Sequence, residues 1–172
     1  MKKLALTFTL FSLLQIGFAQ KRDIPATDHF VISGRVKDSL VVTIGDLKEL
    51  PATQLGNIPI TNHHGEFRSE MKDVEGVSLK AILSKVEIPS ESPRELSEYY
   101  FVLIASDGYK VVYSWNEIFN TSVGDSIFVL TKMDGMGLEA MQNRISTLAT
   151  TDFRTGRRYT KGLARIEVRR VE

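Results

Sequence analysis

The chain has 172 residues, of which 22 are basic and 21 acidic, and it contains no cysteine. This length suits one domain with one core. The formal net charge of +1 suggests no nucleic-acid partner, although the basic residues that gather between 154 and 170 suit an anion site as well as a solvated face. The lack of cysteine excludes disulfides, thiol nucleophiles, iron–sulfur clusters and any thiolate-ligated metal.

The amino terminus has the pattern of a secretory signal peptide. Lys2 and Lys3 precede an apolar run that small residues follow, so we expect residues 1–19 to be cleaved after Ala19 and residues 20–28 to form a linker. A retained anchor is the alternative, but the apolar run of about 15 residues is shorter than the roughly 20 that span a bilayer. Cleavage removes two lysines and no acid, so the net charge falls from +1 to −1. The mature protein is expected to be periplasmic or secreted, without a stable membrane span.

Apolar residues alternate with polar ones at the start of the predicted domain. The period of two over residues 30–36 is that of a strand with one face in the core. A second strand, residues 40–43, should pair with the first across a short turn. Thr43 and Asp46 have the spacing of a helix-capping box, which predicts a helix of one to two turns before Pro51.

The next segment predicts a strand, a polar loop and a helix. Residues 52–62 are extended by propensity, and we expect the polar residues 63–75 to form an irregular loop. Ser78 suits a helix N-cap. The apolar residues that follow at helical spacing predict a helix over residues 78–86, with Pro89 ending the element.

The remainder of the chain is rich in strands. Asp107-Gly108 between two β-rich runs is a strong hairpin signal, and Ser114 with Glu117 predicts a short helix after the hairpin. The other expected segments are a surface loop at 89–98 and strands at 99–106, 109–115, 125–133, 145–149 and 163–171. Together the elements predict an α+β domain over residues 29–172 that is mostly antiparallel, with two or three short helices.

Histidines and carboxylates are close together around residue 65. His63 and His64 stand next to Glu66, and imidazole and carboxylate groups suit zinc or iron. Neighbouring residues on a strand point to opposite faces, so we expect no metal site and two loop histidines that face solvent or form hydrogen bonds. The carboxylates between 66 and 75 could supply a glycosidase pair, but we expect a solvated acidic loop.

The run Thr155-Gly156-Arg157-Arg158 is a candidate anion site. Glycine lets backbone N–H groups converge, and arginine supplies a planar double donor. A basic turn without a ligand is the alternative. The sequence has no G-x-S-x-G elbow and no phosphate-binding or dinucleotide-binding glycine motif, so hydrolase and nucleotide-binding functions have no support.

Five segments, spread over residues 29–171, carry a family resemblance by their order and spacing. They are Phe30–Val36, Thr43–Leu47, Glu75–Leu83, Ser106–Tyr109, and Asp152–Tyr159 running into Ala164–Val168. In this arrangement the chain resembles the oxidoreductase molybdopterin-binding domain family of the sulfite oxidase superfamily. The resemblance implies a sulfite-oxidase-like molybdopterin-binding fold.

The resemblance also implies where a cofactor would bind. Active family members place a cysteine thiolate on molybdenum in the stretch before the Gly-Val-x-Leu helix, and they hold the pterin phosphate with basic and backbone groups. Here that stretch is about residues 60–68 and contains no cysteine. The residues implied to bind molybdopterin or another small anionic ligand are His63, His64, Arg68, Gly156, Arg157 and Arg158.

Three functions are open at this point. The first is an exported ligand-binding or accessory module without thiolate-bound molybdenum. The second is a molybdopterin-dependent oxidoreductase for oxygen-atom or electron transfer, in which the cofactor itself supplies the sulfur ligands. The third is a protein-interaction module, a partner of a membrane or redox complex, which predicts an exposed apolar patch and a shallow pocket. The fold class does not decide between them.

Overall fold

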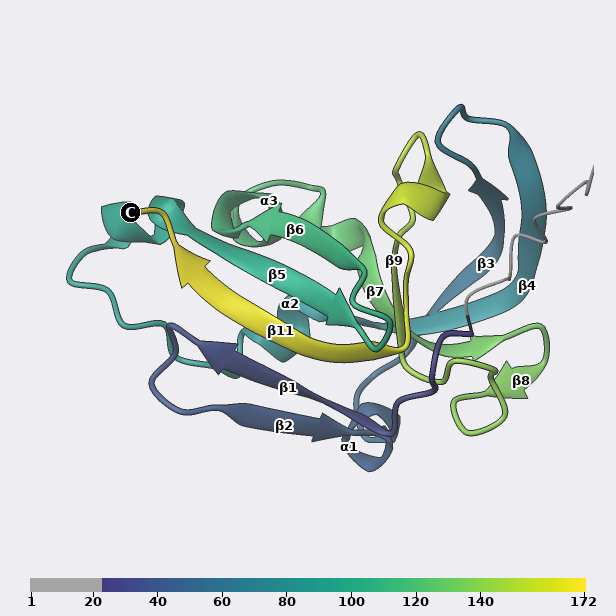
Figure 1. Cartoon of the computed structure of the whole chain (residues 1–172), viewed down its shortest axis with the longest axis horizontal. Helices are drawn as coiled ribbons and strands as arrows, with labels where there is room; N and C mark the ends of the chain where they lie inside the picture. The colour runs from purple at the N-terminus through teal and green to yellow at the C-terminus, as the bar shows by residue number, and fades with distance from the viewer. Residues whose placement is uncertain (1–22) are drawn as a thin grey trace, which may run out of the picture.

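The computed structural model describes residues 23–172, and two β-sheets form its framework (Figure 1). The first sheet has five strands in the order β2-β1-β11-β5-β6. Their bounds are β1 His29–Gly34, β2 Leu40–Thr43, β5 Tyr99–Ala105, β6 Lys110–Ser114 and β11 Leu163–Arg170. β1 is parallel to β11 and the other pairs are antiparallel, so strands from the two ends of the chain meet inside this sheet.

The second sheet has the order β10-β9-β7-β4-β3, and a short strand β8 pairs with β7. Their bounds are β3 Thr53–Thr61, β4 Phe67–Ser78, β7 Ile127–Met133, β8 Met136–Gly137, β9 Ser146–Ala149 and β10 Thr160–Lys161. All of these pairs are antiparallel. The expected strand-rich and mostly antiparallel α+β domain is confirmed, with the β1–β11 pair as its parallel exception.

Three short α-helices begin at capped residues, as the sequence predicts. They are α1 Ile44–Lys48, α2 Leu79–Leu83 and α3 Trp115–Phe119. Thr43 and Ser114 form capping boxes, and the Ser78 side chain accepts from the backbone N–H of Ala81. Helix α2 ends before the predicted residue 86, because the backbone N–H groups of Lys85 and Val86 reach back only three residues, to Ile82 and Leu83. Short 3₁₀-helices lie at Pro93–Glu98, Gly124–Ser126 and Thr155–Arg157.

One hydrophobic cluster joins residues of both sheets and of the helices. In β1, Phe30 and Ile32 are fully buried while Val31 and Ser33 between them are partly exposed, which is the predicted period of two. The apolar face of α2 joins the same cluster and contacts β7 and β4. This continuous packing gives the domain a single core.

The expected irregular loop at residues 63–75 is wrong. Only residues 62–66 form a turn, and from Phe67 the chain continues as strand β4, in which Met71 pairs with Ile58 of β3. Between residues 67 and 73 only Met71 is buried. This half of the hairpin is polar because it extends beyond the core, and a solvated strand has the composition of a loop.

The first described residues pack against the domain. Residues 24–28, here called the N-terminal strap, lie within the predicted linker. The side chains of Asn143 and Ser106 donate to the carbonyls of Ile24 and Pro25, at 2.8 and 2.6 Å. At Gly162, with φ +63°, a Cβ would lie 2.6 Å from the Pro25 carbonyl oxygen, so the strap approaches as closely as a residue without a side chain allows.

The predicted signal peptide, residues 1–19, lies outside the described residues. Among residues 23–172, no helix is both long enough and apolar enough to cross a membrane.

Candidate ligand-binding site

The structure brings the two predicted site segments into direct contact. The β3–β4 hairpin and the 155–157 turn project from the same side of the molecule (Figure 1). The backbone N–H of Thr61 donates to Thr155 Oγ1 at 3.1 Å, and this hydroxyl donates to the Pro59 carbonyl at 2.8 Å. Gly156 fits against the hairpin because any Cβ there would overlap the Thr61 carbonyl oxygen. Glycine is therefore required for this close approach.

A pocket of about 360 Å³ lies beside this contact. Its lining is mostly apolar and comes from the strap, β3, the β5–β6 turn and the segment after residue 155. The lining residues are Ile24, Ile60, Ala105, Asp107, Tyr109, Gly156, Tyr159 and Lys161. This volume is within the lower range of small-ligand sites.

Two tyrosines of this lining are held by hydrogen bonds to their hydroxyls. The Tyr109 hydroxyl donates to the carbonyl of Arg157, which ties the β5–β6 turn to the basic turn. The Tyr159 hydroxyl contacts Met133 Sδ at 3.8 Å, and the Lys161 ammonium lies 4.9 Å from the Tyr159 ring centre. Burial raises the pKa of Tyr159 to about 12, which keeps its hydroxyl protonated and uncharged at physiological pH.

Three hydroxyls on strands near the pocket lack a hydrogen-bond partner among the described residues. Thr61 follows Ile60, Thr160 lies between Tyr159 and Lys161, and Thr147 pairs with Thr160 across β9 and β10. Buried hydroxyls in proteins are ordinarily bonded to protein, water or ligand atoms. All three oxygens are buried and none of these threonines lines the pocket, so they are unsatisfied groups in the packing beside it.

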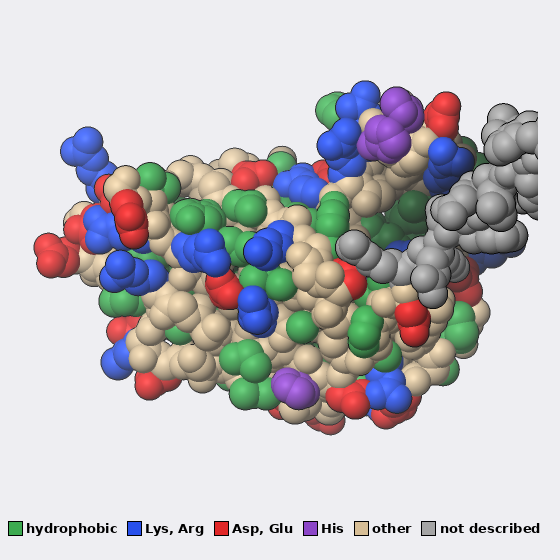
Figure 2. Space-filling view, in the orientation of Figure 1, with side chains coloured by type: hydrophobic (Ala, Val, Ile, Leu, Met, Phe, Trp, Pro, Cys, Tyr) green, Lys and Arg blue, Asp and Glu red, His purple; other side chains and the backbone are tan. Residues whose placement is uncertain are grey.

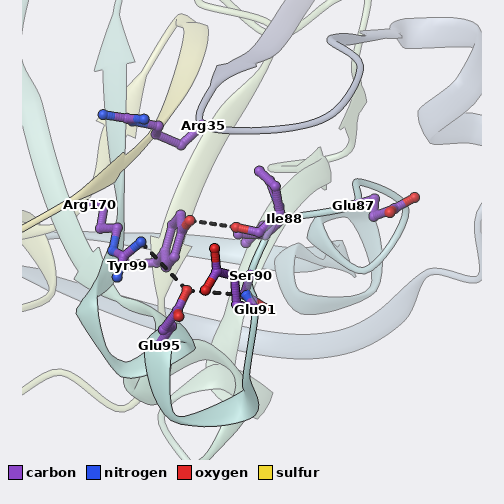
Figure 3. A pocket seen from close by; sticks show the side chains of 9 residues that line it. Arg35, Glu87, Ile88, Ser90, Glu91, Glu95, Tyr99 and Arg170 are labelled. Carbon is purple, nitrogen blue, oxygen red and sulfur yellow. Dashed lines mark hydrogen bonds and ion pairs between the residues drawn. The ribbon is translucent and has the colours of Figure 1, made fainter.

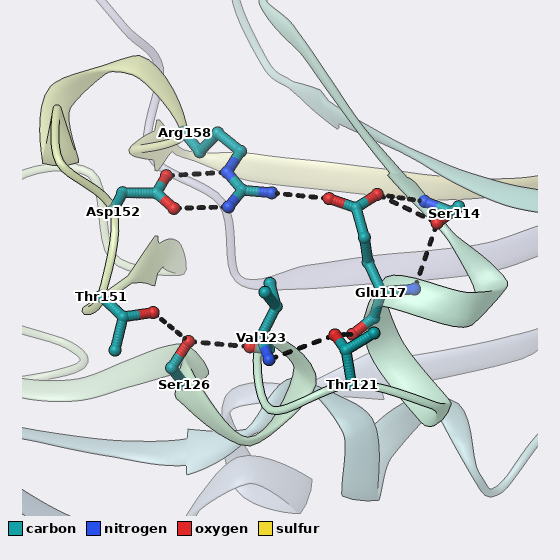
Figure 4. Close-up of polar contacts among 8 residues, drawn as sticks. All are labelled: Ser114, Glu117, Thr121, Val123, Ser126, Thr151, Asp152 and Arg158. Atoms are coloured by element: carbon teal, nitrogen blue, oxygen red, sulfur yellow. Dashed lines mark hydrogen bonds and ion pairs between the residues drawn. The ribbon is translucent and has the colours of Figure 1, made fainter.

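Arg158 has a structural role instead of facing the pocket. It donates to both carboxylate oxygens of Asp152, with Nε to Oδ2 at 2.7 Å, and to Glu117 at 3.2 Å (Figure 4). Its guanidinium also lies 4.6 Å from the ring centre of buried Tyr113. The hydrogen bonds to Asp152 are the main cause that raises the pKa of Arg158, while burial raises the pKa of Tyr113. Arg158 thus links α3 to the loop before the 155–157 turn.

His63, His64 and Arg68 lie at the outer end of the hairpin and do not line the pocket. The histidine ring centroids lie 3.8 Å apart with the rings tilted at 47° to each other, and Arg68 pairs with Glu66 at 3.4 Å. Figure 2 shows purple histidine side chains beside Lys and Arg side chains on the upper projection. In residues 23–172 no group of three or more His, Cys, Asp or Glu could hold a metal ion.

A second pocket, of about 460 Å³, lies near the end of β11 (Figure 3). Part of its polar lining is engaged: Arg170 pairs with Glu98 and Glu95, and the Tyr99 hydroxyl donates to the Pro89 carbonyl.

Sequence reasoning found Gly156 but missed most of the pocket. Tyr109 and Tyr159 lie inside segments that carry the family resemblance, yet nothing in their local sequence marks them as pocket residues. Ile24 and Lys161 come from segments without a motif. Only the packing of the strap and of β10 reveals them.

Comparisons with known proteins support the fold and leave the family open. A scan against protein-family models finds no match, and no curated protein matches the sequence. Among solved structures, the sulfane dehydrogenase SoxCD from Paracoccus pantotrophus is similar, with a TM-score of 0.55 and 14% identity over 81% of this chain. The match covers 37% of that chain, so this chain spans little more than a third of its length. At this identity the similarity shows the fold alone.

The pocket does not fit a molybdenum centre held by a protein thiolate. The sequence has no cysteine, and the lining has one cation, Lys161. The donors of Arg158 are engaged by Asp152 and Glu117. A phosphate group ordinarily needs several converging donors, which this lining does not present.

Proposed function

We propose that the chain is an exported ligand-binding or accessory module on a sulfite-oxidase-like fold, without thiolate-bound molybdenum. One observation carries the proposal. The hairpin, the basic turn and the N-terminal strap converge on a pocket with two tyrosines, although they are far apart in the sequence. The similarity in fold to a sulfane dehydrogenase supports the choice of fold.

The lining favours a small ligand with a flat apolar body. Tyr109 and Tyr159 offer ring surfaces for stacking, and Ile24 and Ile60 offer aliphatic contacts. Lys161 favours an anionic group. A small aromatic compound with one anionic group meets these conditions.

The first experiment is native mass spectrometry of mature protein purified from its own host, with molybdenum and pterin analysis of the same sample. We expect a bound mass of small-molecule size and no stoichiometric molybdenum. Amino-terminal sequencing should begin at Gln20 if the chain is exported as proposed. A protein without any bound mass that also fails to bind flat aromatic anions in calorimetry would contradict the ligand-binding proposal.

A variant pair tests the position of the site. Replacing Tyr109 by alanine should weaken binding of the ligand about tenfold, because it removes one ring wall. The same replacement at Tyr100, a partly exposed residue of β5 outside this lining, is the control and should leave affinity unchanged. Equal losses in both variants would place the site elsewhere.

The alternative is a molybdopterin-dependent oxidoreductase whose cofactor supplies its own sulfur ligands. The similarity in fold to a dehydrogenase favours it over other enzyme classes. Stoichiometric molybdenum and pterin in the same purified sample would establish this alternative.

A further inference from the structure

Two phenylalanines are exposed at the outer end of the molecule. Phe153 is 101% exposed and Phe67 is 65% exposed, whereas Phe30 and Phe101 in the core are fully buried. Phe67 begins β4, and Phe153 lies two residues before the 155–157 turn. A large apolar side chain in water stabilises nothing in the isolated fold, so an apolar or interfacial partner would account for this pair.

The two phenylalanines belong to neighbouring projections. Phe67 pairs across the hairpin with Thr61, whose backbone N–H is bonded to the side chain of Thr155. The turn of the hairpin also meets the other loop, because a Cβ on Gly65 would lie 4.0 Å from Arg154 Nε. We call these two segments, residues 62–68 and 152–157, the docking tip.

The docking tip carries positive charge that nearby acids do not neutralise. Arg154 and Arg157 are exposed, and their side chains form no ion pair or hydrogen bond within the described chain. The acids of the tip, by contrast, are engaged: Glu66 by Asn62 and Arg68, and Asp152 by Arg158. The groups available to a partner are therefore arginines and phenylalanines, and Figure 2 shows Lys, Arg and His side chains on this projection.

We propose that the docking tip binds the surface of an anionic lipid bilayer. The phenylalanines enter the boundary between headgroups and acyl chains, and Arg154 and Arg157 contact lipid phosphates. The shape of the docking tip favours a bilayer over a protein partner. The apolar groups protrude on two turns and line neither pocket described above, and a fluid interface accepts protruding rings without a matching cavity. This surface activity is additional to ligand binding and does not depend on it.

Vesicle sedimentation tests the proposal on the mature chain. With vesicles of phosphatidylcholine that contain about a third phosphatidylglycerol, we expect the protein to pellet, and with pure phosphatidylcholine it should stay largely in the supernatant. A chain that stays in the supernatant with both kinds of vesicle overturns the proposal, and this is the result that a tip made for a protein partner would give. Equal binding to both vesicles overturns the role of the arginines.

Variants with matched controls separate insertion from simple charge attraction. Phe153→Ser should lower vesicle partitioning about tenfold or more, and Arg154→Gln about fivefold. The controls are Val112→Ser, which removes a half-exposed apolar side chain of β6, and Arg94→Gln, which removes an exposed arginine of the Pro93–Glu98 turn. Full binding by Phe153→Ser overturns insertion, as does an equal loss in the Val112 control.

A fluorescent reporter gives a second measurement that does not depend on loss of binding. Trp115 is the single tryptophan and lies in α3, where its ring centre is 5.1 Å from that of Phe119. In a Trp115→Phe background, Phe153→Trp places the reporter at the tip. Its emission should shift to the blue on anionic vesicles and be quenched by brominated acyl chains. An unchanged spectrum in the pelleted protein overturns insertion.

Discussion

Two adjacent arginines in the basic turn have different roles. The Arg158 side chain is 24% exposed and that of its partner Asp152 is 14% exposed, whereas the Arg157 side chain has no ion pair with a described residue. Removing Arg158 leaves Asp152 partly buried without its double donor. Removing Arg157 leaves its backbone carbonyl in place for Tyr109. The two adjacent arginines look alike in the sequence, but Arg158 stabilises the fold and Arg157 is exposed to solvent.

This difference is testable by stability. Arg158→Ala should lower the free energy of unfolding by about 2–3 kcal/mol, because charged hydrogen bonds to a partly buried carboxylate are lost. Arg157→Ala is the control and should change it by less than about 0.5 kcal/mol. Urea denaturation measures both values. Similar values for the two variants would contradict the assigned roles.

Tyr159 predicts a dependence of stability on alkaline pH. Its pKa is about 12 in the fold against 10.0 for the free side chain, chiefly through burial. The folded state keeps the proton that the unfolded state releases, so this contribution is complete below pH 10 and is lost as the pH rises toward 12. The loss should be on the order of 2 kcal/mol.

Unfolding curves at pH 9 and near pH 11.5 measure this effect. Tyr159→Phe should reduce the difference between the two curves, while Tyr100→Phe at a partly exposed position serves as the control. Tyr113, whose pKa burial also raises, will leave a remaining slope in both variants. An identical pH dependence in wild type and Tyr159→Phe would show that Tyr159 titrates freely.

At the scale of elements, the contact between the hairpin and the 155–157 turn depends on Gly156. Gly156→Ala should destabilise the fold by about 1–3 kcal/mol and weaken ligand binding, because the new Cβ would push the turn away from Thr61. Gly137→Ala is the matched control, since an added Cβ there meets no heavy atom within 4 Å and the residue is exposed. Thermal unfolding and calorimetry of both variants test the contact. Unchanged binding and stability in Gly156→Ala would mean that the two segments can separate without effect.

Local sequence patterns predicted those elements well whose hydrogen bonds join residues only a few positions apart in the sequence. The capping boxes at Thr43 and Ser114 and the turn at Gly108, with φ +85°, depend on residues within one or two turns. Strand β4 was missed because its polar first half is stabilised by pairing with β3, which no pattern within residues 63–75 reveals. The amino-acid composition of a segment indicates how exposed it is to solvent, not whether it forms a strand. An exposed strand of a hairpin therefore has the same polar composition as a loop.

At the scale of the whole molecule, the sequence predicted the class of fold but little of the site. The class follows from strand-forming runs and turns that can be read locally. The pocket combines Ile24 with Tyr109 and Tyr159, and the sheet joins β1 to β11, so both depend on pairings between distant segments. The implied site residues His63, His64 and Arg68 lie outside the pocket, on the docking tip.

The N-terminal strap and β1 form several of their contacts with residues more than 100 positions later in the chain. Ile24 is held by Asn143, Asp28 by Arg144, and β1 by β11, so none of these contacts can form until nearly the whole chain has been made. Such distant pairing slows folding. One wall of the pocket is then completed only after the rest of the domain is in place.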